Sequence, residues 1–206
     1  MGSRSTEQLI FVDYIDPCVA RIAYLAMSTM ASPIHGIGEY PFSIKWTTTN
    51  GRPIGTQEQD VWHTEKHEDW GGDVVHTSLA FYKGILNSVE LDHLVNGTLD
   101  PAFAAEHIQT FIEAFAGAFK LREVDNIVDS TELASERRSV ITSTYIIPGY
   151  RSHGERGIVG IVEALGEMID HVAFEELGFA YITGTVNKTN ARSIRALEKR
   201  GMTFLC

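Results

Sequence analysis

The stretch from residue 145 to residue 202 constrains the fold most, because five elements follow one another within it. Residues 145–147 are apolar and β-favouring, and residues 148–157 then break the pattern with a proline and several glycines. From residue 158 to residue 177, apolar residues recur at three- and four-residue spacing, which predicts one face of an amphipathic helix. Gly178 is expected to end this helix.

A second strand and a second helix complete this unit. Residues 179–186 form a short β-rich run, and Asn190 is placed as the N-cap of a helix that Gly201 closes. At a glycine-rich turn before a helix, unpaired backbone N–H groups point outward and favour an anion. The sequence therefore predicts that a phosphate-bearing ligand binds at the turn after residue 147.

The residue pattern of this region resembles that of a known family. The turn at residues 148–154 resembles that of the GNAT superfamily of acyl-CoA N-acyltransferases, whose signature is Arg/Gln-x-x-Gly-x-Gly/Ala; Arg156 holds its last position, and Gly157 comes one residue late. Residues 173–178 and 186–202 resemble the ribosomal-protein acetyltransferase subgroup, which reads Asn-x-x-Ser-x-x-x-Leu-Glu-Lys-x-Gly-Phe. Together these matches cover roughly the last third of the chain.

The resemblance implies an α/β (α+β) fold: a GNAT-like mixed, mostly antiparallel sheet flanked by helices. An incomplete C-terminal hairpin is expected, because only residues 202–206 follow Gly201. It also implies acetyl-CoA as co-substrate and direct transfer of the acetyl group to an amine, which could be a protein N-terminus, a lysine or a small amine. The residues that the resemblance assigns to acetyl-CoA are Ile146, Ile147, Arg151, Ser152, His153, Gly154, Glu155, Arg156, Gly157, Asn190 and Ser193.

Three residues are the catalytic candidates. Many GNAT members place a Tyr seven residues after the Asn to protonate the leaving thiolate; here that position is Leu197, and Ser193 is proposed to substitute for it. Tyr145 could contribute a hydroxyl. A general base is expected to be a carboxylate near the cofactor strand or in a polar loop. Glu136 is the working candidate for it, and Glu132, Glu65 and Glu68 remain alternatives.

The rest of the chain is predicted to form one domain with the C-terminal unit. Residues 9–12 are a predicted first strand, and Asp16-Pro17 and Asp100-Pro101 each carry the signature of a capped helix start. Further strands are predicted at residues 42–46, 61–63, 74–82 and 140–147. An aromatic stripe predicts a second amphipathic helix, from Phe103 to Phe119. The domain is thus divided into residues 9–100 with the acceptor-side loops, a helical insertion at 101–138 and an acyl-CoA-binding half at 139–206.

Composition limits the partners. The chain has 17 Lys and Arg against 27 Asp and Glu, a net charge of −10, which argues against nucleic acid and suits a cationic amine acceptor. Two cysteines without a framework favour a reducing, cytoplasmic compartment, and no stretch is long and apolar enough to span a bilayer. His63, Glu65 and His67 do not match the zinc-protease motif, so no metal is expected.

Two other functions stay open. One is a GNAT-fold protein that has lost catalysis and serves assembly or regulation. The other is a nucleotide-binding module that uses the same turn, which is weaker because no Walker-type Lys-Ser/Thr follows the glycines. A further expectation is that the sheet edge beside residues 179–186 is covered by another chain, either a second copy or a partner.

Overall fold

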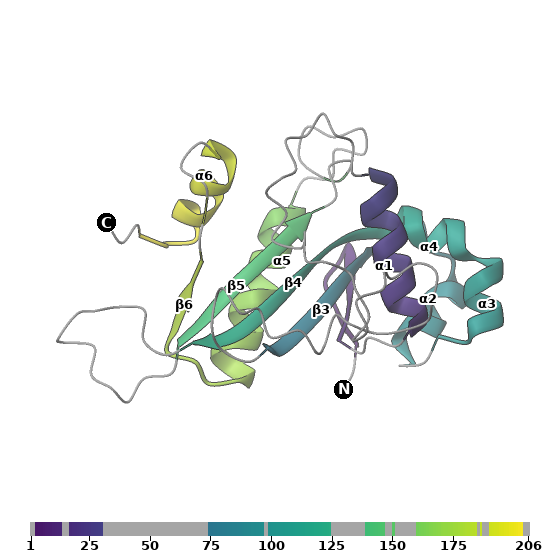
Figure 1. The fold of residues 1–206 in the computed structure, drawn as a ribbon, viewed down its shortest axis with the longest axis horizontal. Coiled ribbons are helices and arrows are strands. Elements are labelled where there is room, and N and C mark those ends of the chain that lie inside the picture. Colours follow the sequence, from purple (N-terminus) through teal and green to yellow (C-terminus); the bar gives the residue numbers. More distant parts are fainter. Residues whose placement is uncertain are drawn as a thin grey trace, which may run out of the picture.

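The computed structural model describes residues 3–13, 17–30, 74–96, 99–124, 139–146, 150, 160–184, 186 and 190–203. Within these ranges the chain forms one mixed sheet with helices on both of its faces (Figure 1). The strands lie in the order β1-β2-β3-β4-β5-β6, so each strand lies next to the strands before and after it in the sequence. Their bounds are β1 Ser3–Ser5, β2 Leu9–Val12, β3 Val74–Tyr82, β4 Phe115–Val124, β5 Ser139–Ile146 and β6 Tyr181–Thr183.

The direction of the strands changes at one place. The pairs from β1–β2 to β4–β5 are antiparallel, whereas β5 and β6 run parallel. A parallel pair needs a crossover connection, and helix α5 supplies it here. The sheet is therefore mixed and mostly antiparallel, as the sequence predicts.

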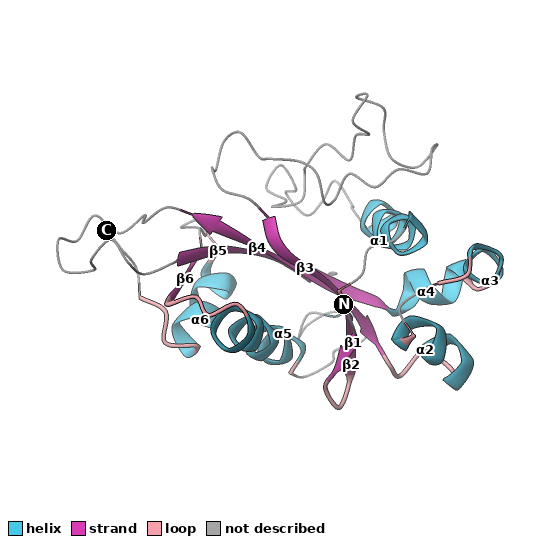
Figure 2. Cartoon of the chain, turned by 90° about the horizontal axis from the view of Figure 1, so that it is seen from below, coloured by secondary structure: helices cyan, strands magenta, loops and turns pink. Residues whose placement is uncertain are grey.

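The helices lie in three groups, seen most clearly with the sheet on edge (Figure 2). Helix α1 lies on one face of the sheet, α5 and α6 lie on the other, and α2, α3 and α4 gather at the end near β3. Their bounds are α1 Pro17–Met30, α2 Ser88–Val95, α3 Pro101–Glu106, α4 Ile108–Ala114, α5 Ile161–Asp170, the π-helical η3 His171–Glu176 and α6 Ala191–Lys199. No helix in these described ranges has the length and apolar character needed to cross a bilayer.

The predicted helix from Phe103 to Phe119 is wrong in its second half. It starts as predicted, with the Asp100 carboxylate accepting the Phe103 N–H at 2.9 Å, but it is broken at His107 and gives way to β4 at Phe115. Residues 115 to 124 pair with β3 at one edge of the strand and with β5 at the other, and consecutive side chains such as Ala118 and Phe119 are buried on both faces. The helical insertion assigned to residues 101–138 therefore contains a central strand of the sheet.

Two elements of the structure are absent from the sequence-based prediction. Strand β1 pairs with β2 although it is only three residues long. Helix α2 begins with a capping box: the Asn87 side chain accepts the N–H groups of Val89 and Glu90, and the Glu90 carboxylate accepts the Asn87 N–H at 2.8 Å. An Asn followed three residues later by a Glu is the sequence signal for such a start, so α2 was detectable.

Most other boundaries agree with the predictions. Strands β2, β3 and β5 lie where expected, and the long helix begins at Ile161, three residues later than predicted. Gly178, with a φ of 68°, follows the end of η3 in a conformation that favours glycine. The predicted strands at residues 42–46 and 61–63, the loop with Glu65, and the Asp16 cap lie outside the described residues.

Candidate functional site

Strands β5 and β6 are paired only along the first part of β5. Their register joins Ser139 to Tyr181 and ends where Ile141 faces Thr183, whereas β5 continues to Ile146 and stays paired with β4 throughout. Gly184, the residue after β6, still lies beside Thr142: a Cβ placed on it would be 3.7 Å from the Thr142 Cγ2. Beyond that point no described strand pairs with β5 on the β6 side, so this edge can accept another extended chain.

A helix N-terminus follows the open stretch of β5. Helix α5 begins after Gly160, whose φ of 96° is one that favours glycine, and no described side chain caps this end with a hydrogen bond. The first N–H groups of a helix have no partner within the helix and carry a partial positive charge. Its buried residues, among them Leu165 and Ile169, hold the helix on the sheet.

Tyr150, the one described residue between Ile146 and Gly160, is anchored in the core. It is 1% exposed, its hydroxyl donates a hydrogen bond to the backbone carbonyl of Glu113 at the end of α4, and its ring lies 5.7 Å from that of Tyr82 on β3. The sequence pattern places Tyr150 only within the turn. A bulky ring among Gly, Arg, Ser and His residues was the available signal for an anchor.

Replacing Tyr150 with Phe is expected to remove this hydrogen bond while keeping the ring. A buried hydrogen bond contributes about 1 kcal/mol, and its loss should lower the melting temperature by about 2–4 °C in a chain of this size. Differential scanning calorimetry measures the shift, and Tyr150→Ala should lower the melting temperature further. An unchanged melting temperature in Tyr150→Phe would show that the hydroxyl does not anchor the turn.

Asn190 caps α6, as the sequence predicts. Its side-chain oxygen accepts the N–H of Ser193 at 3.2 Å, and the residue is exposed at the surface. The Ser193 side chain is half-buried one turn into the helix. The cap uses the Asn190 carbonyl oxygen, so the amide NH2 group is the part of the side chain that could serve a ligand.

The structure describes only part of the predicted site. Ile146 ends β5 opposite Gly117, and Tyr145 lies in β5 opposite Ala118, although the Tyr145 side chain is not described. Of the predicted site residues, the structure describes the side chains of Ile146, Asn190 and Ser193. Outside the described residues lie Ile147, Arg151, Ser152, His153, Gly154, Glu155, Arg156 and Gly157 of the cofactor set, and Glu65, Glu68, Glu132 and Glu136 of the candidate bases.

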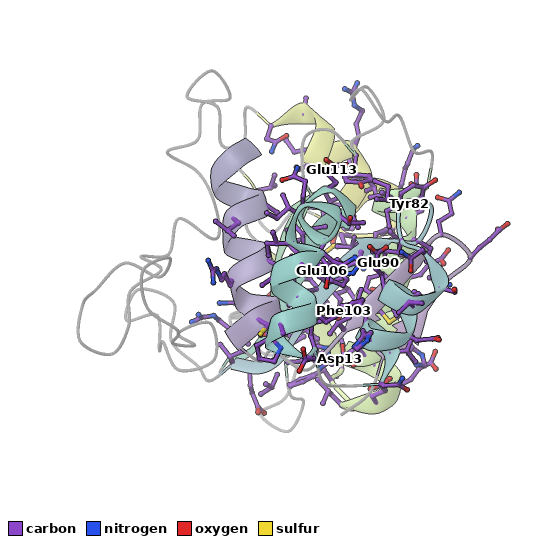
Figure 3. The ribbon with its side chains drawn as sticks, turned by 90° about the vertical axis from the view of Figure 1, so that its right-hand side faces the viewer. Asp13, Tyr82, Glu90, Phe103, Glu106 and Glu113 are labelled. Atoms are coloured by element: carbon purple, nitrogen blue, oxygen red, sulfur yellow. The ribbon has the colours of Figure 1, made fainter. Side chains whose placement is uncertain are left out.

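A cluster of polar and aromatic side chains lies away from this site, among α2, α3 and α4 (Figure 3). The Phe103 ring stacks on the rings of His93 and His107, with centroid distances of 3.8 Å and 4.2 Å. The His107 Nδ1 lies 2.9 Å from the Glu90 carboxylate oxygen. Glu90 is 3% exposed and also closes the capping box of α2. These contacts join three short helices, which accounts for the cluster by packing alone.

Comparison with known proteins adds little to this geometry. No protein-family model matches the sequence, and no curated protein matches it. One solved structure, described as the crystal structure of a probable acetyltransferase, is similar over 98% of this chain and 82% of its own, with 15% sequence identity and a TM-score of 0.48. At that TM-score the likeness carries no argument about function.

Proposed function

We propose that the chain is an acyltransferase that binds acetyl-CoA along the open edge of β5 and transfers the acetyl group to an amine. The observation that carries this proposal is that the pairing of β5 with β6 ends at Ile141 and Thr183, while β5 continues to Ile146. In the GNAT enzymes that the C-terminal sequence resembles, the pantetheine arm of the coenzyme lies between two diverging strands. An amide-bearing arm can pair with the free edge of β5 as an added strand does.

The two ends of the coenzyme would then meet different groups. The arm would follow β5 toward its carboxyl end, so the pyrophosphate would lie near the N-terminus of α5, where N–H groups and the helix dipole favour an anion. Glu163 in the first turn of α5 already interacts favourably with that dipole, so the backbone N–H groups rather than the dipole should contribute most. The thioester would lie at the level of Thr142 and Gly184.

Acetyl-CoA supplies an activated acyl group, and the protein would have three tasks. It would hold the amine and the thioester in attacking position, and a backbone N–H of β5 would stabilise the negative charge that develops on the thioester oxygen. The amine nitrogen forms the new amide bond as the carbon–sulfur bond breaks, and the thiolate takes a proton. Ser193, one turn into α6, is the proposed donor of that proton.

The first test is a titration followed by an assay. Acetyl-CoA is titrated into the full chain by calorimetry, and release of free CoA is then measured against a panel of amines. Saturable binding with amine-dependent release would support the enzyme, and an absence of binding would overturn the coenzyme proposal. Binding without release for every amine would instead support a GNAT-fold protein that keeps the coenzyme without catalysis.

Asn190 offers a matched pair of variants. Asn190→Ser keeps a good N-cap and removes the amide NH2, whereas Asn190→Ala removes both. We expect Asn190→Ala to lower the free energy of unfolding by about 1 kcal/mol and Asn190→Ser to leave it nearly unchanged. Both should weaken acetyl-CoA binding about tenfold, as the loss of about one hydrogen bond would.

Thermal unfolding and calorimetric titration separate the two roles of Asn190. If Asn190→Ser bound acetyl-CoA as tightly as the unchanged protein, Asn190 would be a cap and nothing more.

A further inference from the structure

Two buried cations lie on one face of the central strand β4. Lys120 and Arg122 are two residues apart, so their side chains leave the strand on the same side. They are 3% and 4% exposed. Phe119 and Leu121, which alternate with them, are fully buried on the opposite side. Lys and Arg are rarely buried to this degree unless a partner compensates for their lost hydration.

Arg122 has no such partner among the described residues. Its Nη1 is buried without a hydrogen bond, and desolvation lowers the pKa of its guanidinium below the usual value. Arg200, by contrast, donates to the Asp170 carboxylate at 2.5 Å and to the Gly166 carbonyl at 3.0 Å. The chain thus pairs one partly buried arginine with an acid and leaves another without one.

A second unsatisfied group lies beside these cations. Thr77 on β3 faces Lys120 across the strand pair, is 5% exposed, and its Oγ1 has no hydrogen-bond partner within the described ranges. Residues that face each other in an antiparallel pair lie on the same face of the sheet. A guanidinium and a hydroxyl are therefore buried at diagonal positions of β3 and β4, and the Arg122 Nη1 and the Thr77 Oγ1 both have hydrogen-bonding capacity left for a ligand.

The position of Arg122 relates it to the proposed acyl site. In register, Arg122 faces Ile141 on β5, and Ile141 faces Thr183 on β6. This is the last paired row before β5 and β6 separate. An arm lying against β5 just beyond that row would be about 10 Å from β4, which is two strand spacings. Arg122 is thus one strand removed from the place where the acetyl group would be transferred, with β5 between them.

We propose that Arg122, with Lys120 and Thr77, binds an anionic oxygen group, a carboxylate or a phosphate, carried by the acceptor amine. A guanidinium suits this task because its planar N–H groups bind such oxygens in pairs. The acceptor would then be an amine with an acid group of its own, such as an amino acid, rather than a simple cation. This inference rests on the proposed acyltransferase function.

The test uses acceptors in matched pairs: glycine with glycinamide, and O-phosphoethanolamine with ethanolamine. CoA release is measured for each with the unchanged protein, Arg122→Met, Arg122→Lys and, as a control, Arg21→Gln on the exposed side of α1. We expect the anionic member of one pair to be preferred, and the pair that shows the preference identifies the anion. Arg122→Met should lower kcat/KM for that member about tenfold to a hundredfold, mainly through KM, because a charge-assisted hydrogen bond is lost.

The neutral amines and the other two variants test whether the effect is specific to the anionic group. Arg122→Met should leave the neutral amines unaffected, Arg122→Lys should restore part of the preference, and Arg21→Gln should behave as the unchanged protein. Equal rates for both members of each pair, or an equal loss for both in Arg122→Met, would overturn the proposal.

Binding measurements separate this proposal from the acyltransferase itself. Acetyl-CoA should bind the unchanged protein and Arg122→Met equally well. An absence of acetyl-CoA binding in both would contradict the proposed acyltransferase function but not the anion site. Inorganic phosphate and acetate are titrated separately without coenzyme, with thermal stability as the readout. Stabilisation by either anion that disappears in Arg122→Met would support the anion site even without turnover, whereas the absence of any difference would contradict it.

Discussion

Replacing Phe119 with Ala is expected to lower the free energy of unfolding by about 3–5 kcal/mol. The Phe119 side chain is fully buried on β4, and its ring lies 6.4 Å from that of Phe11 and 5.6 Å from that of His76. Removing it takes away the buried apolar surface and leaves a cavity that a strand paired on both sides cannot collapse to fill. The fold should lose a large part of its stability.

Chemical denaturation, followed by circular dichroism, measures this loss. The matched control is Phe174→Ala, because the Phe174 side chain is 43% exposed and its removal should cost well under half as much. If both variants lost a similar free energy, Phe119 would not belong to the core, and the assignment of residues 115 to 124 to a buried central strand would be contradicted.

Replacing Gly184 with Leu is expected to weaken acetyl-CoA binding by about a hundredfold or more, with little effect on folding. Gly184 is exposed immediately after β6, and a Cβ there would meet only Thr142 at ordinary contact distance. A leucine side chain would extend further from that Cβ beside Thr142, at the level where the thioester is proposed to lie. Binding would then need displacement of the side chain or of the strand, and either costs several kcal/mol.

The control for this variant is Gly184→Ala. Its Cβ would lie 3.7 Å from the Thr142 Cγ2 and 3.8 Å from the Thr142 carbonyl oxygen, which is ordinary van der Waals contact. Calorimetric titration should give nearly the unchanged affinity for Gly184→Ala, while both variants should melt within a few degrees of the unchanged protein. Equal acetyl-CoA affinity in Gly184→Leu and the unchanged protein would exclude this space as the coenzyme site.

The sequence predicts best the elements whose signals are local. The cap at Asp100, the cap at Asn190 and the glycine ends at Gly178 and Gly201 each depend on a few neighbouring residues, and all four hold in the structure. The direction of β6 could also be anticipated, because a strand, a helix and a strand in succession favour a parallel pair.

Strand β4 could not be predicted in the same way. The spacing of Phe111, Phe115 and Phe119 is that of a helix face. Only pairing with β3 and β5 makes a strand more stable than a helix from Phe115 onward. Ala118 and Phe119 are neighbours and both fully buried, which suits a strand covered on both faces. That strand pairing depends on residues 34 to 48 positions upstream, in β3, which no short window contains.

Arg122 escaped notice for a related reason. In the sequence it is one charged residue after Lys120 and Leu121, and such a pattern usually indicates a solvated strand face. Its burial and unused hydrogen bond appear only once β4 takes its place between β3 and β5. The anchoring role of Tyr150 likewise depends on Glu113 and Tyr82, which are far away in the sequence.

The most direct measurement is amide hydrogen exchange of the full chain with and without acetyl-CoA. Binding along β5 predicts that the peptide covering residues 142–146 gains protection on addition of the coenzyme, together with the start of α5, while β1 and β2 exchange as before. Saturable binding that left residues 142–146 unchanged, or an absence of binding, would contradict the claim that the edge of β5 holds the coenzyme.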